Sequence, residues 1–216
     1  MRKFTPEKEN FYHIVNRGTE KRRIFLNHKD YERFIANMVA FNTENDPRLN
    51  ISRYNLNKIF QHIPTNRLVK IHAFCLLPNH FHLLLEQLAE NGISRFMHRL
   101  EMGYARYFNI LHNRNGNLFQ GAYKLVPMED EAHQLYLPIY IHLNPLDLLP
   151  TEKHWRENGI KDHHQAMAFL KKYPWSSFTE YYGTGNLPFI SKELLNDLYK
   201  NSDDWDRAIM SWSSKK

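Results

Sequence analysis

VKIHAFCLLPNHFHLLLEQ, residues 69–87, is the stretch that decides the fold of this chain. Two runs of apolar and β-branched residues, the composition typical of strands, flank the turn signal Pro78-Asn79. Runs of this length joined by so short a turn return antiparallel to one another. The stretch therefore predicts a β-hairpin at the centre of the fold.

Two histidines stand one residue apart in the second half of this hairpin. Side chains alternate between the faces of a strand, so His80 and His82 must project together while Phe81 points into the core. Two neutral imidazoles on one face are suited to hold a divalent cation. Alternatively, both hydrogen-bond neighbouring backbone groups, and the pair alone does not decide. Glu86 lies roughly 13 Å further along the strand, too far to share the ion.

Outward from the hairpin, strand and helix patterns alternate. Asn27 is a plausible N-cap for a helix that follows the first strand, and Pro138 should kink or split the last helix or make it start near residue 138. The expected elements are a strand at 9–19, helices at 27–42, 92–113 and 130–144, a strand at 118–128 that is broken by Gly121, and a polar excursion at 43–66. Strand pairs joined by helices predict an α+β fold, an antiparallel sheet with helices packed on it.

The last third of the chain reads differently. It holds all four tryptophans and two further helix patterns, near 191–200 and 203–212. We expect two parts, an α+β domain over residues 1–148 and a C-terminal helical extension over 149–216. The tryptophans are expected to pack the extension onto the domain.

Composition narrows the class of protein. The chain has 216 residues, a formal charge of +6 and a single cysteine, Cys75, which excludes an internal disulfide and a thiolate zinc cluster. The N-terminus lacks the apolar core of a signal peptide, and no run approaches a membrane span. These features predict a cytoplasmic protein with no membrane partner, and the basic surplus favours a polyanion such as nucleic acid.

Tyr140 and Asn144 are four residues apart in the last predicted helix of the domain, so they share one face. The carbonyl oxygen of an asparagine can serve as a neutral metal ligand. A tyrosine is a weak nucleophile near neutral pH because phenols have a pKa near 10, but a nearby cation makes its phenolate accessible. A structural tyrosine and a capping asparagine would show the same spacing, and Tyr136 is equally well placed.

Five stretches in order resemble the HUH-superfamily single-tyrosine transposases, the small transposases of insertion sequences and their REP-associated relatives. They are YHIVNRG (12–18), AFCLLPNHFHLLLE (73–86), RYFN (106–109), GNLFQGAYK (116–124) and YIHLNP (140–145), with YPWSSF (173–178) as a trailing likeness. The resemblance implies a ferredoxin-like or palm-like HUH domain.

It also implies a metal-dependent single-stranded DNA endonuclease and strand transferase that works through a covalent 5′-phosphotyrosine. His80, His82 and Asn144 would bind Mg²⁺ or Mn²⁺, and Tyr140, in preference to Tyr136, would be the nucleophile. The partner would be single-stranded DNA with a hairpin, and the protein a monomer or a homodimer. A non-cleaving hairpin-binding protein and a phosphodiesterase that uses water remain the alternatives.

Basic residues suggest where such DNA would lie. The densest cluster follows the first strand, a second group borders the turn before residue 124, and a third lines the 92–113 helix. The predicted DNA-binding residues are Arg17, Lys21, Arg22, Arg23, Arg114, Gln120 and Lys124, with Arg95, Arg99 and Arg106 along the helix. Phosphate contacts of this kind make affinity depend on salt.

Overall fold

A four-stranded antiparallel sheet forms the centre of the computed structural model, which describes residues 5–45, 56–182 and 185–212. The elements in chain order are β1 (Phe11–Arg17), η1 (Thr19–Lys21), α1 (His28–Ala40), α2 (Leu56–Phe60), β2 (Val69–Leu77), β3 (His80–Gln87), α3 (Gly92–Leu111), β4 (Lys124–Pro127), α4 (Glu131–Leu143), η3 (Asn144–Leu148), α5 (Trp155–Asn158), α6 (His163–Lys172), α7 (Phe178–Tyr181), α8 (Glu193–Leu198) and α9 (Ser202–Met210). The strand order β2-β3-β1-β4 is that of the split βαβ arrangement.

The predicted hairpin is confirmed to the residue. β2 and β3 pair antiparallel from Leu77 and His80 onward, with a register shift between Ile71 and Ala73. β3 also pairs with β1, which places Arg17 opposite His80. Because β3 is flanked on both sides, the two histidines stand on a strand that cannot move independently of the sheet.

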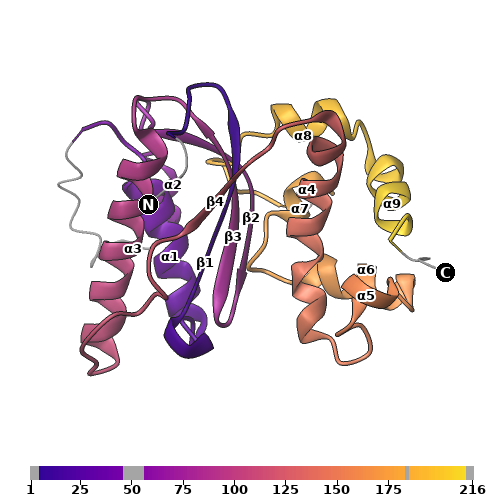
Figure 1. Cartoon of the computed structure of the whole chain (residues 1–216), viewed down its shortest axis with the longest axis horizontal. Helices are drawn as coiled ribbons and strands as arrows, with labels where there is room; N and C mark the ends of the chain where they lie inside the picture. The colour runs from indigo at the N-terminus through magenta and orange to yellow at the C-terminus, as the bar shows by residue number, and fades with distance from the viewer. Residues whose placement is uncertain (1–4, 46–55, 183–184, 213–216) are drawn as a thin grey trace.

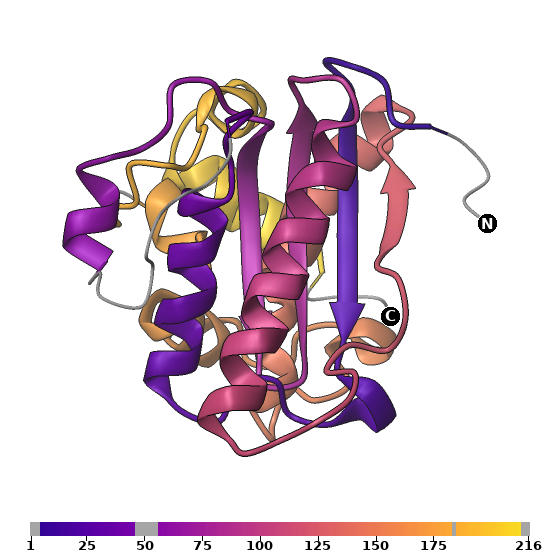
Figure 2. The ribbon, with the colours of Figure 1, turned by 90° about the vertical axis from the view of Figure 1, so that its left-hand side faces the viewer.

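Helices α1 and α3 cover one face of this sheet (Figure 2). α1 begins at a capping box in which the Asn27 side chain accepts from the Asp30 N–H and Asp30 bonds back, as the sequence predicts for Asn27. Phe81 points into this layer and is fully buried against Phe34. Phe81 therefore anchors the strand in the core on this face, while the two histidines lie on the opposite face.

The other face is covered by α4 and the C-terminal helices (Figure 1). Leu84 of the sheet, Ile141 of α4 and Trp155 and Trp205 of the C-terminal segment belong to one buried cluster. The α+β fold with a C-terminal helical region is thus confirmed. The extension shares a core with α4, so it helps to set the position of that helix.

Three expectations need correction. α4 runs from Glu131 to Leu143 with Pro138 inside it, so the helix is neither split nor shortened. Proline removes one N–H, which would bond the carbonyl of Gln134, and Gln134 is only half-buried. The predicted break at Gly121 is present, at a φ of +72°, but the strand that follows it covers only four residues. Residues 46–55 of the 43–66 excursion lie outside the described residues, and its second half contains the short helix α2.

Two arginines of α3 have a structural role. Arg95 donates to the carbonyl of Glu44 at 2.9 Å, and Arg99 donates to that of Thr43 at 2.5 Å. They brace the chain that leaves α1, so they are poor candidates for DNA contacts. In the described part of the chain, no helix has the length and apolar character needed to cross a membrane.

Candidate active site

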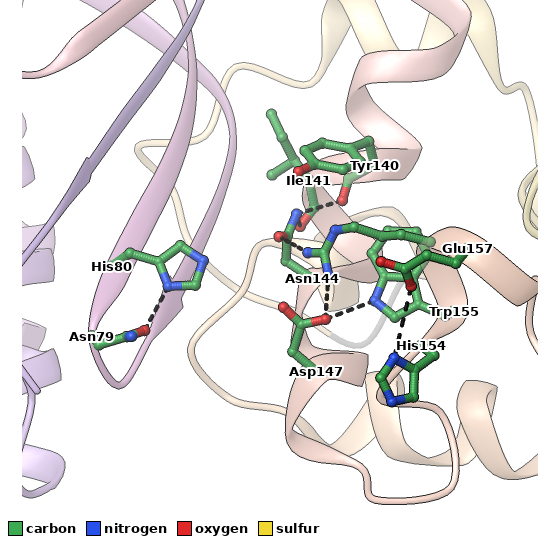
Figure 3. Close-up of polar contacts among 10 residues, drawn as sticks. Asn79, His80, Tyr140, Ile141, Asn144, Asp147, His154, Trp155 and Glu157 are labelled. Atoms are coloured by element: carbon green, nitrogen blue, oxygen red, sulfur yellow. Dashed lines mark hydrogen bonds and ion pairs between the residues drawn. The ribbon is translucent and has the colours of Figure 1, made fainter. Parts of the chain in front are cut away.

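A cavity of about 390 Å³ opens on the α4 face of the sheet, where β1, β3 and β4 meet the end of α4. His80, His82, Tyr140 and Asn144 all line it, so residues up to 64 positions apart meet in one place. Figure 3 shows His80 on the hairpin side, facing Tyr140 and Asn144 on the helix side. The remaining lining residues are Val15, Asn16, Arg17, Lys21, Asn79, Gln120, Ala122, Lys124 and Arg156.

The two histidines project together, as their spacing requires, with ring centroids 5.1 Å apart. His80 Nδ1 lies 2.7 Å from Asn79 Oδ1, while the Asn79 amide donates to the carbonyl of Lys21 at 3.4 Å. An amide oxygen only accepts, so this contact puts the His80 proton on Nδ1 and leaves the Nε2 lone pair available. Burial lowers the pKa of His80 to about 4. Asp147 acts to raise this pKa, whereas Arg156 and Arg17 act to lower it, and the ring is therefore neutral.

His82 is held by a third histidine, His13 of β1, which sequence reasoning missed. His13 Nε2 and His82 Nδ1 are 2.9 Å apart and their rings stack at 5.1 Å. Burial lowers the pKa of His13 to about 4 and that of His82 well below its usual value, so both are neutral. His82 Nε2 is buried without a hydrogen-bond partner among the described residues. The sequence contained one indication of this contact. His13 lies in the YHIVNRG stretch, two residues from Val15 and so on the same face of β1, and Val15 pairs with His82.

Tyr140 completes this group from the last turn of α4. Its ring lies edge-on to His82 and His13, at centroid distances of 5.8 Å and 6.1 Å. Tyr136, the alternative nucleophile by spacing, stacks on the far side of Tyr140 at 5.7 Å and lines a different cavity. The geometry therefore favours Tyr140 over Tyr136 as the group that faces the histidines.

Asn144 follows α4 and is fully buried. Its amide donates to the Tyr140 carbonyl at 2.6 Å, and its Oδ1 accepts from Arg156 Nη2 at 2.6 Å. Arg156 also bonds Asp147. Asp147 accepts in addition from Trp155 Nε1 at 2.9 Å (Figure 3). Burial lowers the pKa of Arg156, but its bond to Asp147 and the proximity of Tyr140 outweigh this and raise it.

Arg156 is the second residue that sequence reasoning missed. Its guanidinium lies over the Tyr140 ring at 5.6 Å and over the Trp155 ring at 4.4 Å. It comes from α5 in the C-terminal segment, twelve residues beyond the last predicted site residue. Only the packing of that segment brings it to the tyrosine.

The predicted DNA-binding residues divide into two groups. Arg17, Lys21, Gln120 and Lys124 line the cavity, and Arg17 Nε donates to Gln120 Oε1 at 2.5 Å. Arg22, Arg23 and Arg114 do not. Arg114 bonds Asn109 and lines a separate polar depression at the end of α3, together with Arg106. The cluster after β1 is therefore split, with only its first members at the site.

The donors in the cavity fit a divalent cation, although in modest number. Within the described ranges, no group of three or more His, Cys, Asp or Glu side chains is arranged to hold a metal ion. The available set is the Nε2 atoms of His80 and His82 and the second lone pair of Asn144 Oδ1. The buried, unpartnered Nε2 of His82 is the strongest sign that a ligand belongs here.

Comparisons with known proteins bear on this geometry. No curated protein matches the chain closely enough to be counted as a relative. A solved structure described as the REP-associated tyrosine transposase bound to a REP hairpin has a similar fold, with a TM-score of 0.51, 13% sequence identity, and coverage of 90% of this chain and 92% of that one. The family model described as "Transposase IS200 like" matches residues 8–144, more than half of the chain. The chain therefore belongs to the IS200-like transposase family.

Proposed function

We propose that this transposase cleaves and rejoins single-stranded DNA through Tyr140, at a site formed within one chain. The observation that carries the proposal is the contact of the Tyr140 ring with His82, at 5.8 Å between centroids. Tyrosine and histidines meet without a second subunit, so a monomer suffices. A homodimer that exchanges α4 is not needed to complete the site.

In the proposed reaction the Tyr140 oxygen attacks the scissile phosphorus and its phenolic proton leaves to solvent. The new O–P bond forms as the bond to the 3′ oxygen breaks, and that oxygen takes up a proton. The products are a 5′-phosphotyrosine and a free 3′-hydroxyl. Attack by another 3′-hydroxyl reverses the step and rejoins a strand. One phosphodiester replaces another, so no nucleotide cofactor is required.

His80 Nε2, His82 Nε2 and Asn144 Oδ1 would hold Mg²⁺ or Mn²⁺. Such an ion polarises the phosphate and neutralises charge that develops in the transition state. Asn79 and His13 engage the Nδ1 atoms of the two imidazoles, which would leave both Nε2 atoms free to bind the ion.

The cations at the cavity rim are suited to hold the DNA strand. Arg17, Lys21 and Lys124 line the cavity together with Tyr140, and no acidic side chain among the described residues lines it. A flexible, strongly anionic strand is the ligand that such a rim attracts. By likeness to the REP-associated transposase with its bound hairpin, we infer that this strand flanks a DNA hairpin.

The test is covalent capture. Labelled hairpin oligonucleotides with single-stranded flanks, taken from inverted repeats beside the gene, are incubated with the protein and Mn²⁺ and run on a denaturing gel. We expect a protein–DNA adduct that disappears in Tyr140→Phe and persists in the control Tyr136→Phe. Cleavage that survives Tyr140→Phe but not His82→Ala indicates a phosphodiesterase that uses water. Tight binding with neither product indicates a binding protein.

A further inference from the structure

A second cavity, of about 220 Å³, shares Arg156 with the candidate active site. Its walls are the rings of Tyr136, Trp155 and Trp212, with Arg156, Gly159 and Ser211 between them. Trp212 packs on Tyr136 and Trp155 at centroid distances of 5.0 Å and 5.1 Å. Three aromatic side chains thus surround one hollow, and the cavity residues from Trp155 onward lie beyond the family match.

Two of the three rings, those of Tyr136 and Trp212, keep surface that the core does not cover. Trp155 and Trp205 are 1% exposed and serve the core, as expected for tryptophans that hold the extension in place. Tyr136 is 47% exposed, and Trp212 is only half-buried, at the end of α9. The Trp212 backbone is already fixed, since its carbonyl accepts from the N–H of Ile160 at 3.0 Å. The indole packs on the rings of Tyr136 and Trp155, and the part of it that stays exposed lines the cavity.

Arg156 is common to both cavities. Its guanidinium lines the active-site cavity and the aromatic one, and lies over the rings of Tyr140 and Trp155. Tyr136 stacks on Tyr140 itself, at 5.7 Å with 14° between the planes. The Tyr136 ring, which lines the aromatic cavity, therefore contacts the Tyr140 ring directly, and the Arg156 guanidinium borders both cavities.

We propose that the cavity formed by Tyr136, Trp155 and Trp212 receives one unpaired nucleobase of the DNA strand whose phosphate faces Tyr140. This proposal rests on the proposed function and adds a subsite to it. A nucleotide joins a flat π-system to an anion, which matches aromatic walls beside a guanidinium. The rim of Arg17, Lys21 and Lys124 supplies the charge that guides such a strand to the entrance.

The lining also indicates what kind of selectivity to expect. Rings, a glycine and the Ser211 hydroxyl, which already donates to the Ala208 carbonyl at 2.6 Å, offer few groups that read base edges. Stacking accepts every base because each has a π-face. The subsite should therefore hold a base without specifying its identity, and should favour purines through their larger ring area.

An abasic scan tests the subsite. Hairpin oligonucleotides with a single-stranded flank, each lacking one flank base in turn, are titrated by fluorescence anisotropy in EDTA so that no cleavage occurs. Wild type should lose about ten-fold in affinity at one flank position, the effect of one lost stack. Trp212→Leu should bind the intact flank as weakly as wild type binds the abasic one, with no further loss at that position. Trp212→Phe should restore most of the difference.

The matched control is Met210→Ala, an exposed residue of the same helix that does not line the cavity. It should show the wild-type abasic profile, and circular dichroism checks that all variants are folded. Equal binding of every abasic flank by wild type overturns the subsite, as does an unchanged profile in Trp212→Leu. Either result leaves the covalent capture by Tyr140 intact, so failure of the subsite and failure of the proposed function are distinguishable.

Discussion

Arg156 Nη2 donates a 2.6 Å hydrogen bond to Asn144 Oδ1, which ties α5 to the residue that ends α4. The same guanidinium lies over the Tyr140 ring. A cation from the C-terminal segment thus occupies one lone pair of the oxygen that we propose as a metal ligand. Because like charges repel, Arg156 and a divalent cation must weaken each other at this oxygen.

We predict that Arg156→Gln binds Mn²⁺ roughly ten-fold more tightly than wild type. Unit charges about 4 Å apart in a partly buried site repel by ~1–4 kcal/mol, and removal of the guanidinium relieves this. Mn²⁺ affinity is measured by electron paramagnetic resonance of the free ion, without DNA. Arg207→Gln, an exposed arginine of α9, is the control and should match wild type. Weaker Mn²⁺ binding by Arg156→Gln would show instead that the arginine orients Asn144 for the metal.

His13 provides a second prediction, because it is the only described side chain that bonds His82 Nδ1. His13→Ala should lower Mn²⁺ affinity by about 10–100-fold, the usual effect of losing a group that orients a metal ligand. His13→Gln, whose amide oxygen can still accept from Nδ1, should lose less. The same resonance titration measures both, and exposed His98→Ala on α3 serves as the control. If alanine and glutamine variants are equally weak, bulk and not the hydrogen bond is what His13 supplies.

The central fold was predictable because its signals are local. Alternation around Phe81 and the turn at Pro78-Asn79 determine the hairpin and the face of each histidine without knowledge of the rest of the chain. α4 was harder, since Pro138 argues against a continuous helix and only packing of its apolar side on the sheet outweighs the lost hydrogen bond. The break at Gly121 was predictable because glycine readily adopts a positive φ, but the length of β4 after this turn does not follow from any spacing.

The candidate site was predictable in part for the same reason. His80 and His82 share a strand, and Tyr140 and Asn144 share a helix, so each pair follows from a period of two or four residues. Arg156 has no such relation to them. It reaches the site because Trp155 is buried beside Asp147 and the segment after α4 folds back. Contacts set by tertiary packing leave no regular pattern in the sequence.

Gly18 provides a stability prediction. A Cβ at this position would lie 2.3 Å from the Arg22 carbonyl oxygen, and the Gly18 N–H donates to the Asn79 carbonyl at 2.8 Å. Gly18→Ala must displace the turn that carries Lys21, so we expect a loss of about 1–3 kcal/mol in the free energy of unfolding. Thermal and urea unfolding measure it. Gly116→Asn is the control for a substitution without a clash: nothing lies within 4 Å of a Cβ there, and asparagine tolerates a positive φ better than most residues, so the loss should be the smaller one. An unchanged midpoint for Gly18→Ala would mean that the turn adapts freely.

Lys124 allows the proposed DNA path to be tested by salt. It pairs with Val15 at the start of β4 and lines the cavity in front of Tyr140. Each phosphate neutralised on a single strand contributes about 0.7 to the slope of log affinity against log salt. Lys124→Gln should therefore reduce that slope by about 0.7 in anisotropy titrations of a flanked hairpin. Lys29→Gln, on the helix that covers the opposite face of the sheet, should leave the slope unchanged. Equal slopes for both variants would place the strand elsewhere.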